Sequence, residues 1–231
     1  MGVNLAQTTW SQCFRIVPSR FPPINLFERV SDAADLDAVL QLESLTNPRL
    51  REEVGSLHLI PPEDRFTGPG AGYVMAAFTH PNPLGSRFSD GSFGVYYAAH
   101  DLDTAIVETV YHQVQHLTYT HEPPQDVDMR VLIAHLVGAL VDGNNSGVEG
   151  LLHPMSYGPG QAFGLAVRSE GRDGIRYASV RQPGGECAAV FRPKCIKSCV
   201  QSAHLIYPWD GIAIQRDRIT TKTLLGFPGA I

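Results

Sequence analysis

Residue types capable of chemistry are concentrated in the segment from Gly85 to His112, where an arginine, two adjacent tyrosines and a glutamate follow one another. Arg87 stands beside a glycine- and serine-rich turn, from which its long side chain can reach a phosphate or solvent. Glu108 lies in a stretch with helical periodicity, opposite the apolar stripe, where a carboxylate faces a cleft or water. Alternation along the preceding strand does not decide which of Tyr96 and Tyr97 is exposed. Taken one at a time, these residues favour an ordinary structural role.

Two groups of potential metal ligands have weaker patterns. His112 and His116 are spaced i, i+4, but no HExxH context accompanies them. Cys195, Cys199 and His204 supply three zinc ligands and no matching cysteine pair, whereas structural zinc sites take four. We therefore expect surface histidines, free thiols and no metal site.

The elements that must position Arg87, the tyrosines and Glu108 are a short strand and a helix. The run Ser92–Ala99 is rich in β-formers, and alternation puts Tyr97 on one face and Tyr96 on the other. Asp101 is a good N-cap for the helix that follows it. That helix carries its apolar residues at one face, namely Leu102, Ile106, Val110, Val114 and Leu117.

The rest of the chain favours strands over helices. Strands are predicted at 14–17, 130–141 (one strand, or two joined at Gly138), 174–180, 187–193 and 202–210, and helices at 32–47, through 50–57 and within 156–166. The spacing does not repeat as βαβ, so we expect an α+β fold with a mixed, mostly antiparallel sheet and flanking helices.

Composition excludes several classes of protein. Of the 231 residues, 43% are hydrophobic and 18% charged, which is typical of a globular domain and not of a disordered chain. The formal net charge of −5 argues against a globally basic nucleic-acid binder, although a local basic patch can still hold a phosphate-bearing small molecule. The longest apolar run, Val131–Val141, is too short to span a bilayer, and we see no secretory signal. We expect a cytoplasmic protein without a membrane association.

Taken together, the motifs resemble the RES-domain family, the toxins of bacterial Xre/RES-type toxin–antitoxin systems. The match consists of a G-x-R turn ending at Arg87, a loop glycine, a Y-x-A strand end at Tyr97 and an A-x-x-E helix at Glu108. The steps from arginine to tyrosine and from tyrosine to glutamate also fit the family, and they select Tyr97 over Tyr96. Downstream, DGIRYASVR resembles the family strand that carries its serine, here Ser179, and FRIVPSRF resembles the opening strand, with Arg15 or Arg20 as an extra contact.

The resemblance implies an ADP-ribosyltransferase-like fold that binds NAD and cleaves its nicotinamide–ribose bond, with NAD as substrate and no cofactor. Glu108 would then hold the ribose hydroxyls and stabilise the cationic sugar that develops, while Arg87 would bind the pyrophosphate or a ribose edge. Tyr97 would stack on the nicotinamide ring, and Ser179 would hydrogen-bond the amide or a ribose hydroxyl, with Arg15 as a further NAD contact. The sugar acceptor is water or phosphate in a glycohydrolase or phosphorylase, and a cellular protein in a mono-ADP-ribosyltransferase. The family also implies an antitoxin partner with a helix-turn-helix domain.

Two departures from the family pattern bear on this interpretation. Phe88 and Ser89 follow the arginine where the family often has Trp-Asn, which keeps open a non-catalytic binding module. The segment 32–80 is longer than in compact members. We therefore expect a single RES-like domain over 1–231, with 13–31 and 81–210 as its core and 32–80 as a helical insertion of unassigned role.

Overall fold

A computed structural model describes residues 5–47 and 49–222. Its strands are β1 Leu5–Pro18, β2 Tyr96–Ala99, β3 Gln125–Asp142, β4 Gly174–Ala178, β5 Glu186–Val190, β6 Ile196–Trp209 and β7 Thr220–Lys222. Its α-helices are α1 Asn25–Arg29, α2 Leu36–Ser44, α3 Leu50–Val54, α4 Ala71–Thr79, α5 Leu102–Tyr119 and α6 Gly158–Ser169. Short 3₁₀ turns join several of them, at Ala33–Asp35, Leu57–Leu59, Pro62–Asp64, Pro193–Cys195 and Arg216–Arg218.

The seven strands form one mixed sheet in the order β1-β2-β5-β4-β3-β6-β7, and β1 also pairs with β3. This additional pairing closes β1, β2, β5, β4 and β3 into a ring. Every pairing is antiparallel except the short parallel contact between β3 and β4. The expected α+β class with a mixed, mostly antiparallel sheet and flanking helices is therefore confirmed.

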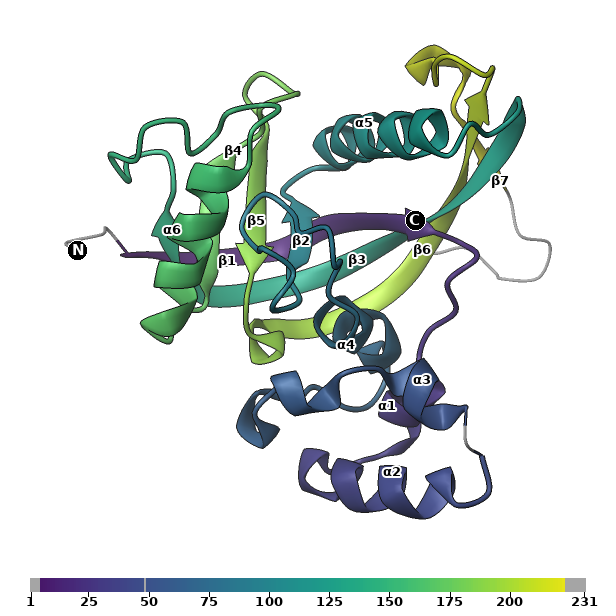
Figure 1. Ribbon diagram of the computed structural model, residues 1–231, viewed down its shortest axis with the longest axis vertical. Helices are drawn as coiled ribbons and strands as arrows, with labels where there is room; N and C mark the ends of the chain where they lie inside the picture. The colour runs from purple at the N-terminus through teal and green to yellow at the C-terminus, as the bar shows by residue number, and fades with distance from the viewer. Residues whose placement is uncertain (1–4, 48, 223–231) are drawn as a thin grey trace.

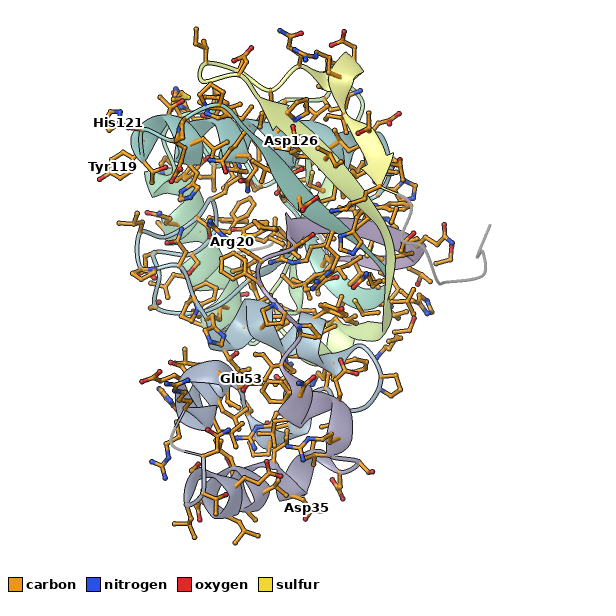
Figure 2. The ribbon with its side chains drawn as sticks, turned by 90° about the vertical axis from the view of Figure 1, so that its right-hand side faces the viewer. Arg20, Asp35, Glu53, Tyr119, His121 and Asp126 are labelled. Atoms are coloured by element: carbon orange, nitrogen blue, oxygen red, sulfur yellow. The ribbon has the colours of Figure 1, made fainter. Side chains whose placement is uncertain are left out.

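Two hydrophobic cores occupy the two faces of this sheet. One core is formed by apolar residues of the small helices α1–α4, which lie on one side of the molecule in Figure 1, together with Tyr96 and Ala98 of β2. The other takes the apolar stripes of α5 and α6, and Phe93, Val95 and Ala99 contribute to it. Figure 2 shows Asp35 and Glu53 on the helical side of the molecule, with Tyr119, His121 and Asp126 near its opposite end.

The helix α4 joins the small helices to the sheet. The Glu28 carboxylate of α1 accepts hydrogen bonds from the backbone N–H groups of Gly70 and Gly72, both at 2.9 Å, and so satisfies donors that a helix start leaves unpaired. A side chain at Gly72 would lie 2.6 Å from the backbone nitrogen of Ile24, which explains a glycine at this contact. At the other end of α4, the ring of Phe78 stacks on Tyr96 with centroids 6.4 Å apart.

Most predicted elements are present with different bounds: β1 and β6 begin before the predicted strands at 14–17 and 202–210, and α1, α4 and β7 were not predicted. The predicted strand Ser92–Ala99 is shortened to Tyr96–Ala99, because the backbone at Gly94 packs directly on α4 and the carbonyl of Phe93 accepts from Ser89 Oγ at 2.7 Å instead of a strand. The helix α4 was not predicted, because the glycine and proline residues just before it indicate a loop rather than a helix start. The segment 130–141 is one strand, continuous through Gly138. The domain boundaries 13–31, 32–80 and 81–210 stay a prediction.

In the part of the chain that the structure describes, no helix has both the length and the apolar character needed to cross a bilayer.

Candidate active site

The helix α5 presents Glu108 to a turn that follows β4. Asp101 caps this helix as predicted, accepting from the backbone N–H of Thr104 at 2.7 Å and from its hydroxyl at 2.8 Å. Ser179 Oγ donates to Glu108 Oε1 at 2.5 Å. Ser179 Oγ also accepts from the backbone N–H groups of Arg181 and Gln182, at 3.2 and 3.0 Å, so the serine is fixed by its own turn. The carboxylate is thus held in one orientation, with its side chain 19% exposed.

Arg181 holds the second oxygen of the same carboxylate, and the sequence interpretation did not include it. Its guanidinium lies 3.5 Å from Glu108 Oε2 and donates to the carbonyl of Pro154 at 3.1 Å. It also stacks over the ring of Tyr111, one helical turn after the glutamate, at 3.5 Å from the centroid. The signal available in the sequence was its position two residues after Ser179, together with an aromatic at i+3 from Glu108.

Arg87 is buried, with 7% of its surface exposed. Its guanidinium donates to the carbonyl of His153 at 2.9 Å and lies over the ring of Tyr157, 4.8 Å from the centroid. Among residues 5–47 and 49–222, no carboxylate lies within 4.0 Å of it. A buried cation with a carbonyl and an aromatic face as its neighbours is suited to an anionic ligand group.

Tyr97 links the loop of Arg87 to the sheet. Its hydroxyl accepts from the backbone N–H of Phe88 at 3.0 Å and is 2.8 Å from Ser86 Oγ. Burial disfavours the charged phenolate and raises the pKa of Tyr97 to about 12. The phenol is therefore neutral near neutral pH and can donate a hydrogen bond. Tyr96, by contrast, is fully buried in the core on the other face.

Two adjacent carbonyls link Arg87 to Glu108: His153 accepts from Arg87, and Pro154 accepts from Arg181, the ion-pair partner of Glu108. Burial, and next the negative charge of Glu108, raise the pKa of Cys187 to about 12, while Arg87 acts in the opposite direction. Burial likewise holds the pKa of Tyr177 well above its ordinary value, and both charges act on it as well. The structure therefore gathers Arg87, Glu108 and its partner Ser179 in one region, beside the hydroxyl of Tyr97.

Arg15 lies at the gap between β1 and β2, in contact with the backbone of Tyr97 and the ring of Tyr96. Strands β1 and β2 are paired only at Phe14 and Ala99, and beyond this pair they separate. There Arg15 donates to the carbonyl oxygen of Tyr97 at 3.0 Å and lies over the ring of Tyr96, 4.9 Å from its centroid. The gap opens into a cavity of about 590 Å³ whose lining includes Arg15, Ser86 and Tyr97. Arg20, the alternative extra contact, is exposed and stacks on Phe21.

The suggested metal ligands do not form a site. The described segments contain no group of three or more His, Cys, Asp or Glu residues able to hold a metal ion. His112 and His116 are exposed on α5. All four cysteines are buried free thiols, namely Cys13, Cys187, Cys195 and Cys199.

Comparison with known families gives the context of this geometry. The RES domain family model matches residues 63–210, a range that includes Arg87, Tyr97, Glu108 and Ser179. The chain belongs to the RES-domain family. Uncharacterized protein y4oC of Sinorhizobium fredii (strain NBRC 101917 / NGR234) is 32% identical over 203 residues, covering 87% of this chain and 84% of the relative. The family match begins at residue 63, inside the segment 32–80 that the sequence interpretation sets apart as an insertion.

Among solved structures, the M. tuberculosis MbcT–MbcA toxin–antitoxin complex contains a chain similar to this RES-domain protein. The identity is 12%, the alignment covers 86% of each chain, and the TM-score is 0.47.

Proposed function

We propose that this RES-domain protein binds NAD and cleaves its nicotinamide–ribose bond. The observation that carries the proposal is the Glu108 carboxylate, held from both sides by Ser179 and Arg181, close to the buried guanidinium of Arg87. Cleavage of this bond passes through a cationic, oxocarbenium-like sugar, which a fixed carboxylate stabilises without reorganising.

In the proposed reaction the bond between the ribose and the nicotinamide nitrogen breaks, and its electron pair leaves with nicotinamide. An oxygen of water or phosphate then forms the new bond to the sugar carbon, and a water nucleophile releases one proton to solvent. Glu108 faces the developing charge, Arg87 binds a phosphate or ribose edge, and Tyr97 contributes a neutral hydroxyl and an aromatic ring. Arg15, on the wall of the neighbouring cavity, extends the same binding region toward the rest of the dinucleotide.

We propose further that the protein is the toxin of a toxin–antitoxin pair that acts by depleting NAD in the cytoplasm. An antitoxin with a helix-turn-helix domain would be its partner. Membership of the RES family supports this role. The residues that depart from the family pattern lie within the fold, since Phe88 is fully buried against the edge of Tyr177, with ring centroids 5.0 Å apart, and Ser89 is 2% exposed. They give no separate support to a non-catalytic binding module.

Purified protein mixed with NAD tests the activity, and loss of the dinucleotide is measured by chromatography. The wild type should consume NAD, and Glu108→Gln should lower the rate at least about a hundredfold, because the neutral amide no longer stabilises the cationic sugar. Asp103→Asn is the matched control, since Asp103 is exposed in the first turn of the same helix.

The products separate the alternatives. ADP-ribose indicates water as acceptor, and its phosphorylated form indicates phosphate. NAD that is consumed only after cell lysate is added, with ADP-ribose appearing on a protein, identifies a mono-ADP-ribosyltransferase. If the wild type consumes no NAD under either condition, the proposal of NAD cleavage is wrong.

A further inference from the structure

A second cavity, of about 210 Å³, lies at the C-terminal end of α6, where it meets the end of β5 and the segment Leu59–Asp64. In Figure 1, α6 lies at the left, and the turns between α3 and α4 lie below and to the right of it. Three arginines line the cavity, Arg168, Arg172 and Arg192, and one carboxylate, Asp64. None of these residues takes part in the candidate active site.

The single carboxylate of the lining is already neutralised. Asp64, 4% exposed, receives two hydrogen bonds from Arg192, at 2.8 and 3.0 Å, and Lys194 lies 2.9 Å from it. Burial acts to raise the pKa of Asp64, but the hydrogen bonds from Arg192 and Lys194 outweigh burial and lower it. Asp64 is therefore held by Arg192 and Lys194, and among the described residues it makes no ion pair within 4.0 Å with Arg168 or Arg172.

Arg168 has the least compensation. Its guanidinium donates to the carbonyls of Phe191 and Leu59 over long distances, 3.3 and 3.4 Å, and lies over the ring of Phe93 at 4.6 Å from the centroid. Within the described ranges, no carboxylate approaches it to 4.0 Å. Burial lowers the pKa of Arg168; the charge of Asp64 opposes this shift, and the like charge of Arg192 adds to it. The fold thus holds a half-buried cation beside a second cation, which costs free energy unless an anion is present.

Arg172 adds a third guanidinium at the rim. Its one ion pair is with Glu170, at 3.3 Å, and both side chains are 38% exposed, so solvent screens the interaction. Counted with their ion-pair partners, the four cations Arg168, Arg172, Arg192 and Lys194 face three carboxylates, Asp64, Glu170 and Asp173, which leaves an excess of one positive charge.

We propose that this cavity binds a phosphate group, as free phosphate or as a small phosphate monoester. A phosphate carries close to two negative charges near pH 7 and presents oxygens that match the planar fork of guanidinium donors. The cavity volume equals the share of about seven water molecules in the liquid, enough for one such group and a few further atoms.

A ligand in this cavity would contact both the segment between α3 and α4 and the end of α6. Leu59, Ile60 and Pro61 lie before the segment that the family model matches, whereas the arginines lie within it. A ligand bound to both parts stabilises the folded chain by mass action. The proposal is independent of NAD cleavage, because it concerns separate residues and a different ligand.

The test is a titration of the full chain carrying Glu108→Ala with sodium phosphate, and separately with phenyl phosphate, at constant ionic strength. Binding is measured by calorimetry and by the shift of the unfolding midpoint. Both phosphates should bind and raise the midpoint, whereas sodium acetate should not. Arg168→Gln and Arg172→Gln should each weaken phosphate binding about tenfold or more, since each removes a charge-assisted hydrogen bond. Arg216→Gln, at an exposed arginine, should leave it unchanged.

Several outcomes overturn the proposal. Equal shifts with phosphate and with sodium chloride would show no site, and equal affinity for acetate would show the wrong ligand class. Phosphate binding that is lost in Arg15→Gln but kept in both Arg168→Gln and Arg172→Gln would place the ion in the cavity beside Tyr97. Because NAD is absent from every arm, a failure here leaves the proposed NAD cleavage unaffected. Binding of inorganic phosphate but not of phenyl phosphate would restrict the site to the free ion.

Discussion

Arg181 determines how firmly Glu108 is held, because its guanidinium makes three different contacts at once. It approaches the carboxylate, donates to the carbonyl of Pro154 and covers the ring of Tyr111. The side chain is 9% exposed, so water competes little with the ion pair. We interpret Arg181 as a positioning residue that acts through Glu108.

Arg181→Lys tests this role while keeping the positive charge. A lysine ammonium is a compact donor that cannot stack on Tyr111 and bind two separate oxygens together. The rate of NAD cleavage should fall about tenfold to a hundredfold through kcat, with KM for NAD changed little, because the carboxylate is misplaced and the substrate contacts at Arg87 remain. Arg29→Lys, at a surface ion pair with Glu43, is the control and should change neither constant. An unaltered kcat in Arg181→Lys would mean that charge alone is sufficient.

The sequence interpretation named Arg87, Tyr97, Glu108 and Ser179 as site residues but did not name Arg181. The spacing of Arg87, Tyr97 and Glu108 depends on one local unit, a turn, a strand and a helix, and local units leave a readable pattern. Arg181 meets Glu108 across 73 residues of chain, through the pairing of β4 with β5, and periodicity carries no information on such a contact.

At the scale of elements, α6 is the support of the Arg87 loop. Its Gly160 and Gly164 lie one turn apart on the same face, and a side chain at either would clash with the backbone carbonyl of Arg87 or Phe88, respectively. The helix therefore contacts the loop backbone without intervening side chains. This contact fixes the loop from which the Arg87 side chain extends.

Gly164→Ala should push the loop away from α6. We expect the free energy of unfolding to fall by about 1–3 kcal/mol, as for other overpacked sites, and NAD cleavage to fall with it. Gly158→Ala in the same helix is the control, because no atom lies within 4 Å of the position its side chain would take. Urea unfolding and NAD loss measure both variants. Equal effects of the two substitutions would show that the close approach does not matter.

The sequence predicted the elements with clear periodicity and missed those defined by tertiary contact. The cap at Asp101 and the stripe of α5 are local, and both were predicted. At the start of α4, Gly70 approaches the backbone of β6 at Cys199 and Gly72 approaches that of Ile24, just before α1. The truncation of β2 at Tyr96 follows from packing of Gly94 on α4. Neither cause is visible before the partner element is known.

At the scale of the whole molecule, the two cores bury the four cysteine thiols and three tyrosines, Tyr96, Tyr177 and Tyr207. Burial raises the pKa values of the thiols to about 11 for Cys199 and about 12 for Cys13, Cys187 and Cys195. It raises those of the phenols Tyr97 and Tyr207 to about 12.

Stability should therefore fall at alkaline pH. A group whose pKa is raised on folding contributes its full stability below the pKa of the unfolded chain, which is about 9 for thiols and 10 for phenols. That stability is lost as the pH rises toward the folded pKa of 11 to 12. Each group adds up to about 1.4 kcal/mol per pH unit to the slope in that window. Urea unfolding between pH 8 and pH 11 measures the slope, and Cys195→Ala should make it shallower. A free energy of unfolding that stays constant over this range would contradict the prediction.

The ring of strands has a consequence for the order in which the protein is made. β1 is synthesised first, yet its partner β3 begins at residue 125, and the ring closes only when β5 at 186–190 has left the ribosome. A nascent chain therefore contains Arg87, Tyr97 and Glu108 well before it has Ser179, and pairings so distant in sequence form slowly. For the whole of that interval the nascent chain exists without a completed candidate site.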